Sequence, residues 1–274
     1  MRRLNFGKII KYSLCYMLAF IWIIPVIWMA ITSVKSTHEI MSFTPYWIPS
    51  EFTLEHFITL INRRPFLLWL ANSFQVAAMA TIITIIVTTF AAYSLSRLRW
   101  YGRDTIFIIL ILAMFIPWEI NSIPLFFIVK EMGLLNNFLS VALPLSALPV
   151  SLFLLRQFFI NIPIDLEEAA KIDGCGHLGI LWHVIIPVSL PAYGALAIFI
   201  FIFSWNEFFW SLVALQRSGV RTLPVGLKTL VGAGDIQYDL MMAGSFMATL
   251  PALILFLLLR KHIIAGISMA GVQR

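Results

Sequence analysis

The sequence has few charged residues, and this scarcity excludes most classes of soluble protein. Only 12% of its 274 residues are charged and 61% are hydrophobic, with a mean hydropathy of +0.93. A soluble globular chain carries about 25% charged residues. The composition therefore predicts an integral membrane protein. The formal charge of +6 fits membrane topology better than nucleic-acid binding, because no Lys/Arg tract is interleaved with aromatic residues.

Disulfide, nucleotide-binding and catalytic patterns are also missing. The two cysteines, Cys15 and Cys175, lie in unrelated settings, which excludes a disulfide scaffold or a cysteine metal site. Without a GxxxxGK[ST] loop, the chain is not a nucleotide-binding subunit. No Ser-His-Asp or Cys-His constellation has a defensible spacing, and no internal repeat is visible. We therefore expect no catalytic residue, no metal and no cofactor bound by this chain.

The sequence does contain long uncharged runs that suit a bilayer. A spanning helix needs about 20 apolar residues. We expect one membrane domain over residues 1–274, all-α and multi-pass, with six transmembrane helices. The expected spans are 12–33, 68–96, 105–128, 135–155, 184–210 and 240–260. The first run is too long for a signal peptide, so we expect it to be retained as a helix.

The basic residues predict the orientation of these spans. With a cytoplasmic N-terminus, twelve of the 19 Lys and Arg residues fall on the inner side and seven on the outer side. This bias favours an N-in and C-in topology. It places the polar segment 163–183 in the cytoplasm, between the fourth and fifth spans. The outer side then holds 36–64, with a short interfacial helix, and the Gly-rich segment 216–239.

The polar segment 163–183 interrupts the apolar sequence with four carboxylates. Its core, DLEEAAKIDG at 165–174, is rich in strong helix formers. We expect Asp165 to cap this helix with Glu168 at its third position, and Gly174 to end it with a positive φ. A second short helix is expected at 177–183. Local physics favours equally an ordinary linking helix and a docking surface for a partner.

The order of residues in this hairpin resembles the EAA motif of ABC importer permeases. Glu168-Ala169-Ala170 is followed after three residues by Gly174, and after nine more by VIIP at 184–187. The family pattern has Ile, any residue, Leu and Pro at the last four positions. SWNEF at 204–208, LPVGL at 223–227 and ATLP at 248–251 are similar to segments of carbohydrate-importer permeases of the maltose-transporter type. The resemblance is dense over the last two spans and extends to the six-span plan.

The resemblance implies a transport subunit in a bacterial or archaeal cytoplasmic membrane. It implies a second homologous permease, two ATPase subunits that carry ATP and Mg, and a solute-binding protein that contacts residues 219–239. The cargo would be a sugar or related polyol, whose identity the sequence leaves open. The hairpin would be the coupling-helix pair that docks onto the ATPase. The coupling residues would be Glu167, Glu168, Ala169, Ala170, Asp173, Gly174 and Pro187.

Two further groups are candidates for the substrate pathway, namely Trp118 with Glu119, and Trp205 with Asn206 and Glu207. A charge inside a span is costly and usually faces a cavity or a partner. The alternative for Glu119 is that Pro117 ends the helix before it. The alternative for the second group is a set of aromatic anchors at the interface. A secondary transporter or channel without an ATPase remains the competing function, and it predicts ion-coupling carboxylates within the membrane.

Overall fold

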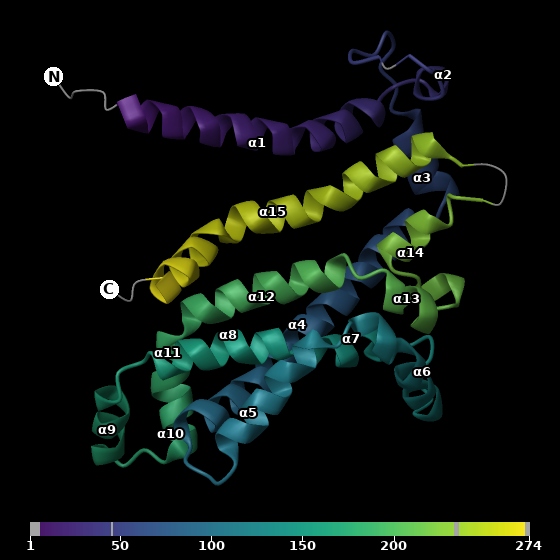
Figure 1. Cartoon of the computed structure of the whole chain (residues 1–274). Helices are drawn as coiled ribbons and strands as arrows, with labels where there is room; N and C mark the ends of the chain where they lie inside the picture. Colours follow the sequence, from purple (N-terminus) through teal and green to yellow (C-terminus); the bar gives the residue numbers. More distant parts are fainter. Residues whose placement is uncertain (1–5, 45, 233–235, 272–274) are drawn as a thin grey trace. The chain divides into compact units, whose positions relative to one another are not determined.

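The computed structural model describes residues 6–44, 46–232 and 236–271, and the regular elements in these ranges are helices. A single isolated bridge pairs Val231 with Ile236 within the same ranges. The all-α prediction is confirmed for the described chain (Figure 1). The α-helices are α1 Phe6–Thr32, α2 Thr37–Ile40, α3 Glu55–Arg63, α4 Phe66–Arg97, α5 Arg103–Leu112, α6 Ser122–Glu131, α7 Leu139–Ser146, α8 Pro149–Ile160, α9 Asp165–Ile172, α10 His177–Ile180, α11 Ile186–Val188, α12 Leu190–Trp205, α13 Phe209–Ala214, α14 Leu223–Lys228 and α15 Tyr238–Gly271. Short 3₁₀ turns lie at η1 Ala113–Phe115, η2 Trp118–Asn121 and η4 Ser218–Val220, and η3 Leu181–Ile185 is a π-helical turn.

Three of these helices are long and apolar enough to cross a membrane by themselves. They are Ile10–Thr32 of α1, the whole of α4, and Tyr238–Leu258 of α15. Three further pairs of helices reach the required length together but are bent. Arg103–Phe115 and Trp118–Glu131 meet at 98°, Leu139–Ser146 and Pro149–Ile160 at 44°, and His177–Val188 and Leu190–Trp205 at 76°. The described residues thus hold three candidate spans, or up to six if each bent pair is one span.

Prolines explain where the bent pairs break. Pro117 precedes η2, Pro149 opens α8, and Pro191 lies in the first turn of α12. Proline has no N–H to donate to the preceding turn, and its fixed φ suits the start of a helix. The run expected as one span at 105–128 is therefore two helices at 98° to each other. The run expected at 184–210 breaks at Ser189, so residues 184–188 belong to the preceding helical segment.

Two compact units can be distinguished in the chain, and the expectation of one membrane domain stays a prediction. Within the described ranges, residues 6–67 with 226–251 belong to the first unit, and residues 68–225 with 252–271 belong to the second. In the first unit the expected short helix of segment 36–64 is present as α3. His56 on α3 is buried, with Nε2 2.8 Å from the Lys35 carbonyl oxygen and Nδ1 3.5 Å from a carboxylate oxygen of Asp239. These contacts fix the segment that follows α1 to the start of α15.

A buried carboxylate also shapes the loop after α2 in this unit. Glu39 Oε1 accepts hydrogen bonds from the Ser50 hydroxyl at 2.5 Å and the Ser50 N–H at 2.8 Å. These bonds stabilise the ionised form and lower the pKa of Glu39 below its usual value. Burial lowers the pKa of Lys35, and the neighbouring carboxylate of Glu39 acts in the opposite direction. The loop is thus held by polar contacts rather than by regular structure.

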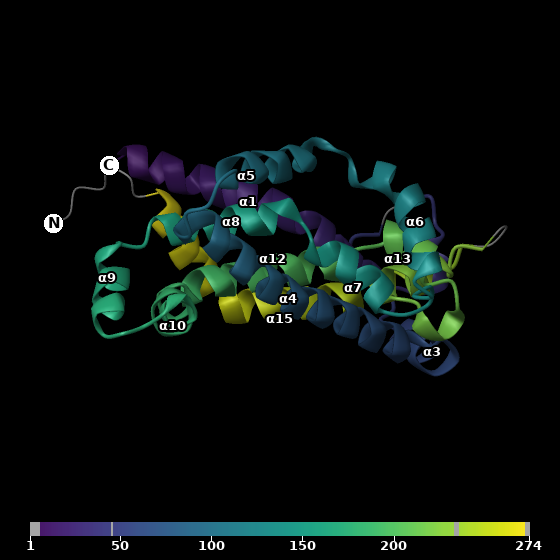
Figure 2. The ribbon, with the colours of Figure 1, turned by 90° about the horizontal axis from the view of Figure 1, so that it is seen from below.

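The second unit contains the polar hairpin and a buried apolar core. Helix α12 packs along α8, and α13 packs against α6 and α7. Figures 1 and 2 show α9 and α10 at one end of α8 and α12, with α6 and α13 at the other end. The hydroxyls of Thr89 on α4 and Tyr193 on α12 lie 2.9 Å apart. The hairpin therefore stands at the end of a packed helical bundle.

Candidate functional site

The hairpin begins with α9, whose start differs from the sequence prediction. Asp165 is the first residue of the helix, and Ile164 occupies the N-cap position with helical angles of φ −66° and ψ −28°. No side chain caps this end. The predicted capping by Asp165 is therefore wrong, because the chain already turns helically one residue earlier. Asp165, Glu167 and Glu168 instead lie in the first turn, where the positive end of the helix dipole favours carboxylates.

The end of α9 agrees with the prediction. Gly174 has φ +86°, in the left-handed region that glycine adopts without steric cost. Its N–H donates to the Lys171 carbonyl at 3.0 Å, and the N–H of Cys175 donates to the Ala170 carbonyl at 2.9 Å. These two bonds form a Schellman motif, which satisfies the last carbonyl groups of the helix. Gly174 thereby turns the chain back toward α10.

The backbone of Gly174 allows a direct test of the hairpin's structure. Gly174→Ala should destabilise the folded hairpin, with its Schellman motif, by about 1–2 kcal/mol, because a residue with a Cβ is strained in the left-handed region. Nothing lies within 4 Å of the added Cβ, so the effect arises from the backbone alone. Hydrogen exchange of the α9 amides should become faster by about tenfold. Gly219→Ala is the control, because that site is also open but has no positive φ. Equal exchange in the two variants would contradict the prediction.

The two faces of the hairpin differ in exposure. Glu167 and Ala170 turn inward and are 4% and 8% exposed. Three other predicted coupling residues, Glu168, Ala169 and Asp173, are exposed. Large apolar side chains on the same hairpin are exposed beside them, namely Ile172, Leu178 and Trp182. An apolar surface rimmed by carboxylates is typical of a site that binds another protein.

The second half of the hairpin is anchored in the core of the unit. Ile180, Leu181 and Ile185 are almost completely buried. They lie on one continuous helical segment, which passes from α10 through the π-helical turn η3 into α11. Pro187, the last predicted coupling residue, is exposed in α11 just before the break at Ser189. The second helix expected at 177–183 is therefore present but extends to Val188.

The inward-facing Glu167 has a partner that the sequence analysis did not single out. Its Oε1 lies 3.0 Å from Nε of Arg97, the last residue of α4. The basic residues at the ends of the spans were interpreted as topology signals only. The position of Arg97 at the end of an uncharged run gave no indication that it pairs with a residue of the hairpin. This pair joins α9 to the end of α4.

The first pathway candidates lie beside the 98° bend. Pro117 precedes η2, which contains Trp118 and Glu119. Trp118 is partly buried against the core of the second unit, whereas the Glu119 side chain is exposed. The geometry thus corresponds to the alternative in which Pro117 follows the end of the helix. A role for these two residues in the pathway stays a prediction.

The second pathway candidates end α12 and lead into α13. Asn206 Nδ2 donates to the Ile202 carbonyl at 2.8 Å, and the rings of Phe201 and Trp205 stack 6.0 Å apart. The carboxylate of Glu207 accepts from the N–H of Trp210 at 2.7 Å. It also accepts from the N–H and the hydroxyl of Ser211 at 2.8 and 2.6 Å. Glu207 therefore caps α13, so any contact with a substrate would compete with three internal donors.

Metal binding has no geometric support in the chain that the structure describes. No group of three or more His, Cys, Asp or Glu side chains within the described ranges is arranged to hold an ion. His183 of the hairpin places Nδ1 2.9 Å from the carbonyl oxygen of Gly179, within its own helical segment.

Comparison with known proteins gives a consistent result. Residues 84–263 match the family described as binding-protein-dependent transport system inner membrane component. The chain is 32% identical to the arabinooligosaccharides transport system permease protein AraQ of Halalkalibacterium halodurans, over 93% of both chains. It is 32% identical to the sulfoquinovosyl glycerol transport system permease protein SmoH of Agrobacterium fabrum, over 97% of this chain and 94% of that one. The diacetylchitobiose uptake system permease protein DasC of Streptomyces coelicolor is 30% identical over the full length of both.

Solved structures share the fold. One chain of a bacterial ABC transporter involved in alginate import superposes with a TM-score of 0.82 at 24% identity. The match covers 95% of this chain and 98% of that chain. A second alginate transporter structure, in complex with a periplasmic protein bound to an alginate pentasaccharide, gives a TM-score of 0.68 at 16% identity. It covers 94% of this chain and 96% of that chain.

Proposed function

Because the chain belongs to the family of binding-protein-dependent transport system inner membrane components, we propose that it is the permease subunit of an ATP-dependent importer of a sugar or related polyol. It is a transport subunit and not an enzyme. The observation that carries the proposal is the family match over residues 84–263, which includes the exposed hairpin. Hydrolysis of ATP, with its Mg, then belongs to two separate ATPase subunits.

The hairpin supports a specific means of energy transfer. ATP cannot enter the bilayer, so work must reach the spans through a contact between folded surfaces. In the N-in topology the hairpin lies on the cytoplasmic side, where an ATPase can reach it. Glu168, Ala169 and Asp173 form its outer face, and Ile172 supplies apolar area beside them. Closure of the ATPase pair would displace α9. The six spans of each of the two homologous permeases would then rock between outward-open and inward-open states.

The chemical class of the cargo follows from the relatives rather than from a pocket. The relatives named above are described as transporting arabinooligosaccharides, sulfoquinovosyl glycerol and diacetylchitobiose. These compounds share sugar rings with several hydroxyl groups, so we propose a glycoside delivered by an extracytoplasmic solute-binding protein. The amide of the exposed Asn206 suits the hydroxyls of a sugar. Trp205 is only 4% exposed and its ring stacks on that of Phe201, so its face is not open to a sugar ring in this structure. The carboxylate of Glu207 already accepts hydrogen bonds from Trp210 and Ser211, which favours a structural role for this residue.

Reconstitution tests the proposal against its alternative. The chain is purified with its second permease and ATPase subunits, placed in proteoliposomes, and supplied with the solute-binding protein and labelled arabinotriose, lactose or diacetylchitobiose. We expect uptake of at least one glycoside that requires ATP on the side of the hairpin. Uptake by the permease alone, driven by an ion gradient, would overturn the proposal. That result would establish the secondary transporter instead.

A further inference from the structure

The ion pair between Arg97 and Glu167 is buried at the base of the hairpin. The two side chains are 8% and 5% exposed, and Nε lies 3.0 Å from Oε1. The other three carboxylates of the hairpin, those of Asp165, Glu168 and Asp173, are exposed. A buried ion pair stabilises a protein little more than an apolar pair of similar volume does. Stability alone is therefore a weak reason for placing a charge pair here.

The guanidinium of Arg97 reaches more than Glu167. Its Nη2 donates to the carbonyl of Ile162 at 2.7 Å and also to the carbonyl of Phe159. Phe159 lies in the last turn of α8, and Ile162 follows that helix. A guanidinium is planar and presents five N–H donors in a fixed arrangement. One side chain at the end of α4 thus holds the end of α8 and the inner face of α9 together.

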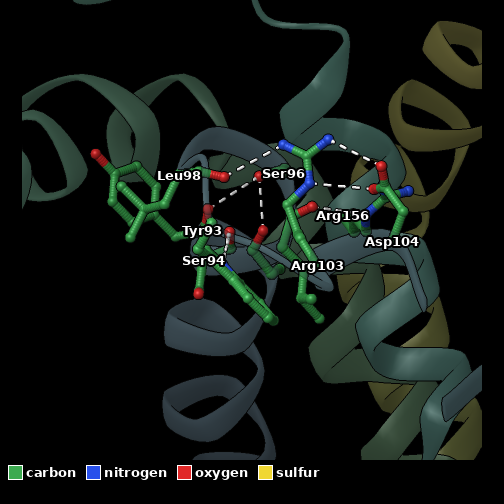
Figure 3. A network of polar contacts seen from close by, with 10 residues as sticks. Tyr93, Ser94, Ser96, Leu98, Arg103, Asp104 and Arg156 are labelled. Atoms are coloured by element: carbon green, nitrogen blue, oxygen red, sulfur yellow. Dashed lines mark hydrogen bonds and ion pairs between the residues drawn. The ribbon is translucent and has the colours of Figure 1, made fainter. Parts of the chain in front are cut away.

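A second arginine completes the link from the opposite side. Arg156 of α8 donates from Nε to the Leu95 carbonyl in the last turns of α4 at 3.0 Å. Its Nη2 lies 3.5 Å from Asp104 at the start of α5, and its guanidinium lies 3.8 Å from the centre of the Phe107 ring. Figure 3 shows Arg156 and Arg103 converging on Asp104. The ends of α4 and α8 are therefore joined in both directions, since each helix sends an arginine to the carbonyls of the other.

We propose that Arg97 is a positioning residue for energy coupling, which transmits displacement of α9 to the ends of α4 and α8. The proposal rests on the proposed function, in which an ATPase moves α9. Arg97 contacts α9 through Glu167, and it contacts the carbonyls of Phe159 in α8 and of Ile162 just after α8. An apolar pair would fill the same volume. It would lack both the hydrogen bonds to the carbonyls of Phe159 and Ile162 and the charge attraction to Glu167, so it would hold the two segments less firmly.

The decisive comparison is between a broken pair and an apolar pair. The single variants are Arg97→Gln and Glu167→Gln, and the double variant combines Arg97→Met with Glu167→Leu. Arg99→Gln is the matched control, since Arg99 is exposed two residues further along. Each is assembled with its partner permease, ATPases and solute-binding protein in proteoliposomes. The measured quantities are the ATPase content of the purified complex, the ATPase rate and the sugar transported per ATP hydrolysed.

We expect all variants to retain their ATPase subunits, because the outer face of α9 is unchanged. Sugar transported per ATP should fall at least fivefold in both single variants and in the double variant. It should stay within twofold of wild type in the Arg99→Gln control. Arg97→Lys should recover less than half of the lost coupling, because Arg97 faces Glu167 with Nε and the two carbonyls with Nη2, whereas lysine has a single nitrogen for both.

Two outcomes would overturn the inference without touching the proposed function. Wild-type coupling in the double variant would show that packing alone suffices. Loss of the ATPase subunits from the single variants would assign Arg97 to assembly rather than to transmission. Failure of the proposed function would look different, since the wild-type complex itself would then transport no sugar with ATP.

Discussion

Replacement of Glu168 by lysine should reduce ATP-driven sugar uptake at least tenfold while the chain still folds. The side chain of Glu168 is exposed on the outer face of α9, so its replacement should change the free energy of unfolding by less than about 0.5 kcal/mol. At a contact with the ATPase, the reversed charge would be buried without a partner. Such a change costs about 2–5 kcal/mol of binding free energy, and each 1.4 kcal/mol corresponds to a factor of about ten.

The measurement is uptake by proteoliposomes, together with the amount of ATPase that copurifies with the chain. Glu131→Lys is the control, because Glu131 is the exposed last residue of α6 and undergoes the same change of charge. Figure 1 places α6 at the end of the unit away from α9, so this control should leave uptake unchanged. Normal uptake by the Glu168→Lys complex would contradict the docking role of the hairpin. It would also favour the transporter that works without an ATPase.

Replacement of Trp210 by alanine should lower the free energy of unfolding by about 3–5 kcal/mol. Trp210 is completely buried, and its indole N–H donates to the carbonyl of Ser140 at 2.7 Å. This bond fastens α13 to α7, and the Glu207 carboxylate holds the N–H of the same residue. Alanine would leave a cavity and an unpaired buried carbonyl. Trp210→Phe should cost less, about 1–3 kcal/mol, because most of the ring volume remains.

Unfolding of the purified chain in mixed micelles with increasing denaturing detergent gives the comparison. Trp182→Ala is the control, since Trp182 is 58% exposed on the hairpin and its removal should change stability by less than about 0.5 kcal/mol. If Trp210→Ala unfolded at the same detergent fraction as Trp182→Ala, α13 would contribute little to the stability of this unit.

The features of the hairpin that depend only on residues close in sequence could be predicted. Gly174 was expected to end α9 with a positive φ, and it does so through bonds that span only a few residues. The expected capping by Asp165 failed because the start of a helix depends on the angles of the residue before it. Which carboxylate faces inward was not predictable at all. That choice depends on Arg97, which belongs to a distant helix and meets Glu167 only in the folded chain.

The spans show a similar limit. Hydropathy identifies a run of apolar residues, but it does not show whether the run is straight. The runs around Pro117 and Pro191 are mostly apolar, and yet their helix pairs bend by 98° and 76°. Glu207 illustrates the same limit for function. A carboxylate beside an amide and aromatic rings was a candidate for sugar contact, with interface anchors as the alternative, whereas in the folded chain that carboxylate accepts from backbone N–H groups.

The Schellman motif at Gly174 has a mechanical consequence for the whole hairpin. Its two backbone bonds join the end of α9 to the segment that starts α10, and α9 also packs on η3. If an ATPase displaces α9 as proposed, these bonds would make the hairpin move as one rigid unit rather than bend between α9 and α10. The fixed point of this movement would be the segment in which Ile180, Leu181 and Ile185 are buried in the core. Displacement of the outer face of α9 would then rotate the whole hairpin and so move Ser189 and the start of α12.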